Sequence, residues 1–149
     1  MDDATQQRLF SETPGTISPS EPGLYLGTSG WSYSDWEGTV YPSGIPAGSR
    51  LAEYVKRYAT VEIDSTFYGT PRPSTVRRWR EISPDGFLFA AKFPQGITHE
   101  GALVGCERET LNFIRTMEEL DDRLGPLLLQ LSPAGGGQAV GTPLPPGHR

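Results

Sequence analysis

Two acidic residues alternate with apolar ones near the middle of the chain, where Glu62 and Asp64 follow Val61 and Ile63 in turn. A two-residue alternation is typical of a β-strand whose successive side chains point to opposite faces. We therefore expect Val61 and Ile63 to face a covering helix. The two carboxylates should face a cleft, because an unpaired buried charge is costly. Paired carboxylates can perform general acid–base chemistry, as they do in glycosidases.

The spacing of this pair is weak evidence for catalysis. Alternate residues of a strand lie about 6.6 Å apart, which falls in the range used by inverting glycosidases, but every such pair has this spacing. Two interpretations stay open. In one, Lys92 on an adjacent predicted strand neutralises a carboxylate within a structural network. In the other, at least one of Glu62, Asp64 and Lys92 takes part directly in catalysis.

His99 lies in a polar loop that follows the strand carrying Lys92. A histidine in such a place can transfer protons, ligate a metal or anchor the loop by a hydrogen bond. Glu62, Asp64 and His99 form the one metal-ligand set that the sequence offers, and no His-x-His or His-x-x-x-His pair accompanies them. A metal at this set is therefore an alternative that the sequence does not favour, and the cofactor is left open.

Aromatic residues gather in the two turns that follow the first two predicted strands. They either form a stacking platform for a planar ligand or plug the end of the sheet, and both roles can coexist. The residues are Trp31, Tyr33, Trp36, Phe67 and Tyr68.

The elements that position these residues follow from periodicity. Strands are predicted at residues 24–28, 60–64, 87–93 and 127–131. Helices are predicted from Ser49 to Tyr58, from a Ser74 cap to Ile82, and from about Glu107 to Leu124, where Gly125 and Pro126 should end the last one. Strands that alternate with helices at this spacing indicate an α/β fold with right-handed crossovers and a parallel sheet.

Composition limits the function classes. The 149 residues fit one domain, and the net charge of -5 argues against a nucleic-acid surface. The basic cluster Arg72, Arg77, Arg78 and Arg80 is interpreted as a solvated helix face. A single cysteine, Cys106, and the absence of a signal sequence or a membrane-length apolar run predict a cytoplasmic protein. Residues 1–22 and 133–149 are expected to be disordered, which leaves residues 23–132 as the folded part.

Four blocks of this sequence resemble the DUF72 family, an uncharacterised group of TIM-barrel proteins. They are Gly27–Tyr33 with Trp36, Thr60–Tyr68, Lys92 with Ile97–His99, and Leu124–Pro126 with Gln130. The family often has asparagine at the position of Asp64, so the resemblance favours Glu62 as the acid/base. It implies a partial (β/α)8 barrel, with four parallel strands and three intervening helices that correspond to the N-terminal half of the family's fold.

Residues at the carboxyl ends of barrel strands form the sites of such proteins. The resemblance therefore implies a polar and aromatic pocket there, with four candidate catalytic residues and eight candidate ligand-binding residues. The catalytic candidates are Glu62, Asp64, Lys92 and His99. The ligand-binding candidates are Thr28, Ser29, Trp31, Tyr33, Thr66, Phe67, Tyr68 and Gln130.

Two hypotheses about function follow. The first is a hydrolase or lyase acting on a sugar-like or nucleotide-like ligand, with Glu62 as acid/base. The second is a truncated barrel that binds a small molecule or has no activity, so the sequence leaves open whether the chain is an enzyme. Half a barrel also has two open sheet edges, and self-association through these edges is expected.

Overall fold

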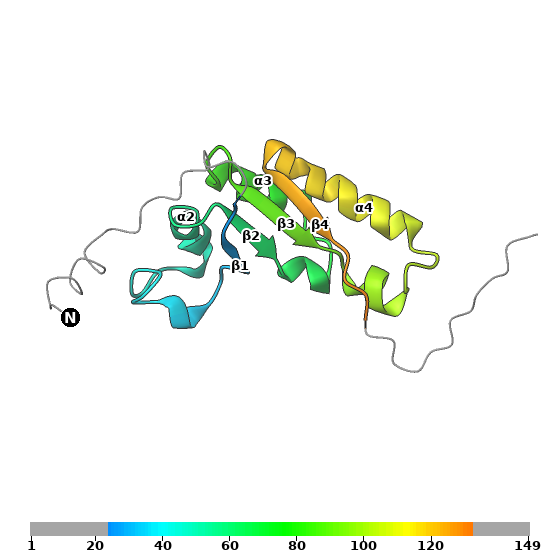
Figure 1. Ribbon diagram of the computed structural model, residues 1–149, viewed down its shortest axis with the longest axis horizontal. Helices are drawn as coiled ribbons and strands as arrows, with labels where there is room; N and C mark the ends of the chain where they lie inside the picture. The colour runs from blue at the N-terminus through cyan, green and yellow to red at the C-terminus, as the bar shows by residue number, and fades with distance from the viewer. Residues whose placement is uncertain (1–23, 133–149) are drawn as a thin grey trace, which may run out of the picture.

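The computed structural model describes residues 24–132, which form an α/β fold around a four-stranded parallel sheet. The predicted tails, residues 1–22 and 133–149, lie outside the described residues. The strand order is β1-β2-β3-β4, so each strand pairs with its neighbours in the chain (Figure 1). The strands are β1 (Gly27–Ser29), β2 (Thr60–Ile63), β3 (Leu88–Lys92) and β4 (Leu124–Leu128).

Helices connect the successive strands. These are α2 (Arg50–Tyr54), α3 (Pro73–Ile82) and α4 (Glu107–Met117). Short helical turns accompany them at Ser34–Trp36, Ala47–Ser49, Ser65–Tyr68, Gly96–Glu100 and Glu118–Arg123. None of the helices within residues 24–132 combines the length and the apolar content that a membrane crossing needs.

The two faces of the sheet differ as the alternation predicts. Val61, Ile63, Phe89 and Ala91 are at most 1% exposed and form one core with apolar side chains of all three helices. The intervening residues point to the opposite face, which we call the open face and define by Thr60, Glu62, Ala90 and Lys92, all half-buried. Glu62 pairs in register with Ala90, so the direction predicted for Glu62 and Lys92 is confirmed.

The start of α3 differs from the prediction. Its cap is Arg72 rather than Ser74, and Pro73 occupies the first helical position. Proline suits this position because its fixed φ is already helical and its missing N–H would have had no helical partner. Ser74 therefore lies inside the first turn.

The predicted end of the last helix is also wrong. α4 ends at Met117 and a 3-10 turn continues to Arg123, with a break at Asp121 (φ 51°, ψ −122°). Leu124, Gly125 and Pro126 then belong to β4 instead of stopping a helix. The strand consequently begins three residues earlier than predicted. Similarly, α2 ends at Tyr54 rather than Tyr58, and Ser49 precedes it without a side-chain capping bond.

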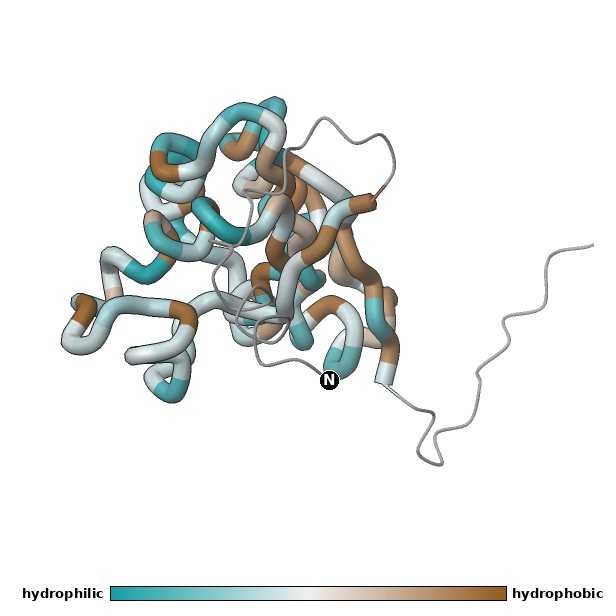
Figure 2. The backbone as a smooth tube through the Cα atoms, turned by 60° about the vertical axis from the view of Figure 1, so that its left-hand side comes forward, coloured by the Kyte–Doolittle hydropathy of each residue, from teal (hydrophilic) through white to brown (hydrophobic). Residues whose placement is uncertain are grey.

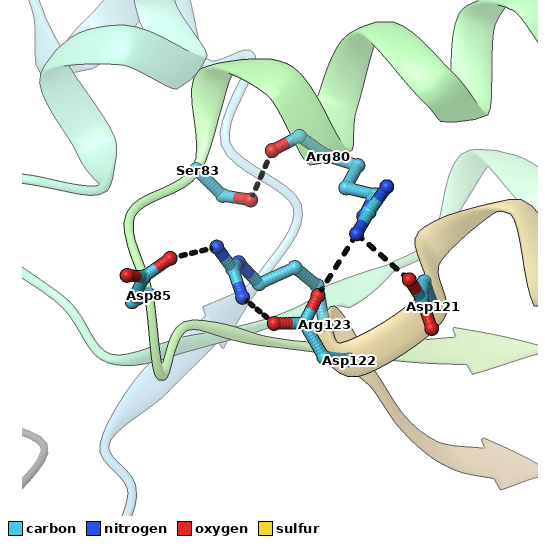
Figure 3. Close-up of polar contacts among 6 residues, drawn as sticks. All are labelled: Arg80, Ser83, Asp85, Asp121, Asp122 and Arg123. Carbon is cyan, nitrogen blue, oxygen red and sulfur yellow. Dashed lines mark hydrogen bonds and ion pairs between the residues drawn. The ribbon is translucent and has the colours of Figure 1, made fainter.

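An ion-pair network holds the amino ends of β3 and β4 (Figure 3). Arg123 is 8% exposed and pairs with Asp85 and Asp122. Arg80 reaches from α3 to Asp121 at 2.7 Å. A buried guanidinium needs such partners, since its desolvation is otherwise uncompensated.

Three arginines of the predicted basic cluster, Arg77, Arg78 and Arg80, form ion pairs with nearby carboxylates. Arg77 pairs with Glu119 at 2.9 Å and Arg78 with Glu81 at 3.1 Å, and the arginines are exposed. All four arginines of the cluster are exposed, so the interpretation of a solvated helix face is confirmed; the ion pairs were not predicted.

Candidate functional site

The two central carboxylates do not lie on one strand. β2 ends at Ile63, and Asp64 begins the helical turn Ser65–Tyr68. Glu62 stays on the open face, where the Ser29 hydroxyl donates to its Oε1 at 3.4 Å. Asp64 is exposed and leans toward the loop after β1. The expected pair of alternating strand carboxylates is therefore divided between two environments.

Gly30 makes the approach of Asp64 possible. Its φ of +75° is favoured by glycine, and its N–H donates to the Glu62 carbonyl at 2.8 Å. A Cβ at this position would lie 3.0 and 3.1 Å from the two Asp64 carboxylate oxygens and 3.1 Å from the Tyr33 hydroxyl. The Tyr33 hydroxyl in turn donates to the Ser29 carbonyl. Glycine is thus favoured where β1 turns away from the sheet, because of its positive φ and because a Cβ would displace the Asp64 and Tyr33 side chains.

These contacts enclose a pocket at the carboxyl ends of β1 and β2. Its volume is about 260 Å³. We call it the β1–β2 pocket; its lining residues are Gly30, Trp31, Ser32, Tyr33, Asp64 and Ser65. The lining offers one carboxylate, two serine hydroxyls and two aromatic rings. No basic side chain belongs to it.

A second group of predicted site residues gathers around Phe67. The Lys92 ammonium lies 4.8 Å from the centre of the Phe67 ring, and the His99 ring meets the same ring edge-on at 5.0 Å. The Thr98 hydroxyl lies 2.8 Å from His99 Nδ1. We call Phe67, Lys92 and His99 the Phe67 cluster. Among residues 24–132 no carboxylate comes within ion-pair distance of Lys92, so the ion pair required by one of the two interpretations is not formed.

Both threonines predicted to bind a ligand, Thr28 and Thr66, form hydrogen bonds that join structural elements. Thr66 is 1% exposed, and its hydroxyl lies 2.7 Å from both the Ile63 and the Lys92 carbonyl oxygens. It therefore joins the ends of β2 and β3 and does not reach the pocket. Thr28 bonds Tyr54 through its backbone N–H and its hydroxyl, both at 2.9 Å. These threonines position the site without lining it.

The remaining predicted residues divide between packing and exposure. Trp31 packs edge-on against Trp79 at 5.6 Å, and Trp36 stacks on Tyr54 at 6.4 Å. Tyr33 and Tyr68 are exposed, the latter to 79%. Trp31 and Trp36 therefore pack against other aromatic side chains, whereas Tyr33 and Tyr68 are exposed to solvent. Gln130 is exposed beyond the end of β4.

Glu62, Asp64 and His99, the metal-ligand alternative, do not converge. Within the described part of the chain, no three His, Cys, Asp or Glu side chains lie close enough to hold one ion. Three pocket residues, Gly30, Ser32 and Ser65, are not among the site residues predicted from the sequence. Their signal was present, since each lies in a polar and aromatic turn directly after a strand. The role of Tyr54, whose hydroxyl also donates to the Thr60 carbonyl at 3.0 Å, was hidden within an apolar helix stripe.

Comparison with known proteins shows which family the chain belongs to. A family model described as "Protein of unknown function DUF72" matches residues 25–141. The chain belongs to the DUF72 family. This DUF72 chain is 37% identical over 108 residues to the UPF0759 protein YecE of Escherichia coli, covering 72% of this chain and 37% of the relative. It is 29% identical over 75 residues to the UPF0759 protein YunF of Bacillus subtilis, covering 50% of this chain and 26% of that protein.

Solved DUF72 structures share the fold. A DUF72 family protein from Thermotoga maritima matches with a TM-score of 0.60 and 31% identity, over 72% of this chain and 44% of that one. A DUF72 family protein from Enterococcus faecalis matches with a TM-score of 0.55 and 26% identity, over 77% and 42%. The chain thus spans less than half the length of the relatives it matches.

A buried tyrosine should make the stability of the DUF72 chain depend on pH in the alkaline range. Tyr41 is 2% exposed and donates to the Trp31 carbonyl at 2.6 Å, and burial raises its pKa from 10.0 to about 12. Between these pH values the unfolded chain releases the proton and the folded chain keeps it. The contribution of Tyr41 to the free energy of unfolding should therefore be fully present below pH 10. Above pH 10 it should fall, by up to about 1.4 kcal/mol per pH unit. Burial raises the pKa of Tyr54 in the same direction.

Urea unfolding at several pH values from 8 to 12 measures this dependence. Tyr41→Phe should have the shallower slope above pH 10, whatever its stability at neutral pH. Equal slopes in the two proteins would show that Tyr41 is not responsible.

Proposed function

We propose that the β1–β2 pocket binds a small, neutral, hydroxyl-rich ligand of sugar-like chemistry. The observation that carries this proposal is that Asp64, two serine hydroxyls and the exposed Tyr33 line the same pocket. Ligands of open parallel sheets bind outside the carboxyl ends of the strands, which is where this hollow lies. Its volume of about 260 Å³ lies just below the usual range of ligand pockets, which starts at about 300 Å³, so it suits a small ligand.

The charge of the lining selects among the ligand classes. Asp64 can accept hydrogen bonds from ligand hydroxyls, while a phosphate would be repelled by it and would find no arginine or lysine in the lining. The exposed Tyr33 ring offers a face on which an apolar sugar face can rest. A sugar-like ligand therefore fits better than a nucleotide-like one.

The barrel interpretation supports the same location. Four parallel strands in sequential order are the arrangement found within a (β/α)8 barrel, whose sites lie at the carboxyl ends of the strands. A second candidate function is hydrolysis or elimination with Glu62 as acid/base. The half-buried position of Glu62 on the open face, with the neutral Ser29 hydroxyl at 3.4 Å, favours it.

Binding can be tested with a panel of monosaccharides and nucleoside monophosphates, followed by NMR shift titration. Asp64→Asn should weaken binding of a monosaccharide hit by about 10- to 100-fold, the value of a hydrogen bond to a charged group. Glu118→Gln is the matched control, because it removes one exposed carboxylate from the turn that follows α4. It should leave affinity unchanged.

Two results would count against the proposal. One is a nucleotide hit with no monosaccharide hit, and the other is equal affinity in Asp64→Asn and the parent. Turnover of a hit is tested separately with Glu62→Gln, and unchanged turnover would remove Glu62 from the mechanism.

A further inference from the structure

Lys92 is a charged residue in an otherwise apolar strand. It is the only charged residue in 87–93, and the hydrophobic colouring in Figure 2 follows the strands of the sheet. Lys92 is half-buried at the carboxyl end of β3. Taking an ammonium group partly out of water is unfavourable unless an anion or other acceptors replace the lost water. An ammonium group in this position therefore favours an anionic partner.

The register of the sheet explains why β2 supplies no such partner. Ile63 pairs with Ala91, so a β2 that continued by one residue would place Asp64 beside Lys92. The strand ends at Ile63 instead, and Asp64 leans toward the loop after β1. The carboxylate that the alternating pattern would bring to Lys92 is thus directed away from it.

The Lys92 ammonium group forms no ion pair or hydrogen bond with any residue in 24–132. The other acid of the open face, Glu62, accepts a hydrogen bond from the Ser29 hydroxyl at 3.4 Å. The ammonium group lies 4.8 Å from the centre of the Phe67 ring. A contact with the face of a ring stabilises a cation without using its N–H groups one by one, so hydrogen-bond donors remain for a ligand.

His99 presents a second ligand-accessible atom beside the same ring. The Thr98 hydroxyl lies 3.2 Å from the Pro94 carbonyl oxygen and 2.8 Å from His99 Nδ1. A hydroxyl has one hydrogen and a carbonyl can only accept. Both contacts are therefore satisfied when Thr98 donates to Pro94 and the His99 Nδ1–H donates to Thr98. In the neutral ring, Nε2 then carries a lone pair, and no residue in 24–132 bonds to it.

We propose that the Phe67 cluster binds the carboxylate of a small α-hydroxy acid. The carboxylate pairs with the Lys92 ammonium, and the neighbouring hydroxyl donates to His99 Nε2. Lys92 Nζ and the centre of the His99 ring lie 4.8 and 5.0 Å from the centre of the same Phe67 ring, so they are at most about 10 Å apart. A small molecule with a hydrogen bond of about 2.8 Å at each end can span such a separation.

The two ligand-accessible atoms select this class of ligand. A phosphate dianion has only acceptors, so it would set an oxygen against the Nε2 lone pair. A simple carboxylate would satisfy Lys92 and leave Nε2 without a hydrogen. The hydroxyl beside the carboxylate supplies that hydrogen, so an α-hydroxy acid is the better match.

The short turn Ser65–Tyr68 places this site next to the β1–β2 pocket. Ser65 lines the pocket, and Phe67 follows it by two residues. The Thr66 hydroxyl between them lies 2.7 Å from the Lys92 carbonyl oxygen, which holds the turn against β3. The pocket has a carboxylate and no basic side chain, whereas the cluster has a cation and no carboxylate. The hydroxy acid is therefore a second ligand, distinct from the neutral ligand proposed for the pocket.

Glycolate, acetate and inorganic phosphate are the probes, titrated into the whole 149-residue chain at constant ionic strength and about pH 8, and followed by NMR shifts. Glycolate should bind about 2- to 10-fold more tightly than acetate, which lacks the hydroxyl, as one hydrogen bond predicts. Phosphate should bind more weakly than glycolate. No binding of glycolate, equal affinities of glycolate and acetate, or tighter binding of phosphate would overturn the proposal. This ranking needs no variant.

Two variants test the two groups. Lys92→Met removes the charge and keeps an unbranched stem, so glycolate should bind about tenfold more weakly or worse. His99→Phe keeps a ring beside Phe67 and removes Nε2, so the affinity for glycolate should fall to that for acetate. Lys56→Met is the matched control, because Lys56 is the other lysine of the chain and its side chain is 63% exposed. It should leave the affinity for glycolate unchanged.

Circular dichroism verifies that each variant is folded, and Lys92→Gln replaces Lys92→Met if the latter is not. Unchanged glycolate binding in the Lys92 variant, an equal loss in Lys56→Met, or a preference for glycolate that persists in His99→Phe would each contradict the proposal. The β1–β2 pocket is tested with a monosaccharide and Asp64→Asn, so either proposal can fail while the other stands.

Discussion

Replacing Phe89 by alanine should lower the free energy of unfolding by about 3–5 kcal/mol. Phe89 is fully buried on β3, and its ring meets Phe87 at 4.9 Å and Trp31 at 6.4 Å. Alanine would leave a cavity between the sheet and the loop that carries the pocket. Since a domain of this size has a total stability of only about 5–15 kcal/mol, the variant should lose most of its cooperative unfolding transition.

Two further variants serve as controls for Phe89→Ala. The stability of all three variants is measured by urea unfolding followed by circular dichroism. Tyr68→Ala removes an aromatic ring that is 79% exposed and should change stability by less than about 0.5 kcal/mol. Phe89→Leu preserves most of the volume and should cost under about 1.5 kcal/mol. A Phe89→Ala effect as small as that of Tyr68→Ala would mean that the core is not packed as described.

Gly27→Ala should cost about 3 kcal/mol, by forcing apart β1 and β2. A Cβ on Gly27 would lie 2.0 Å from the carbonyl oxygen of Thr60, its register partner. Backbone cannot yield as a flexible side chain can, so the three-residue strand β1 has to shift. The loop that follows β1 carries Trp31 and Tyr33, and the pocket should open with it.

Gly48→Ala is the matched control, because a Cβ there meets nothing within 4 Å. It should be neutral or slightly stabilising. Urea unfolding compares the two, and tryptophan fluorescence reports on Trp31. If both glycine variants had the same stability, the close approach of β1 to β2 would be refuted.

The layout of the sheet could be predicted because it depends on local pattern. The alternation at Val61, Glu62 and Ile63 correctly separated core from open face, and the alternation of strands and helices correctly predicted a parallel sheet. Element boundaries were less predictable. The structure continues from Leu124 directly into β4 because the backbone breaks at Asp121, and nothing in the local sequence requires a break there.

The candidate site was predicted by region more than by residue. Asp64 lies at the correct end of the sheet, but its side chain turns toward Gly30 because β2 stops one residue earlier. Thr66 was assigned to ligand binding because it follows a strand, whereas its hydroxyl is used by two backbone carbonyls. Such a role depends on residues distant in sequence, here Lys92 on β3, and no single-chain pattern reveals it.

The two walls of the β1–β2 pocket are held with unequal strength. Asp64 and Ser65 follow β2, which has a hydrogen-bonded neighbour on each side, whereas Trp31, Ser32 and Tyr33 follow β1, which lies at the edge of the sheet formed by residues 24–132. A ligand that bridges the walls would bind only while β1 stays paired, so part of its binding free energy would hold the edge in place. Affinity and the thermodynamic stability of the first strand are therefore linked quantities. Any partner that secures β1 would tighten binding without touching the ligand.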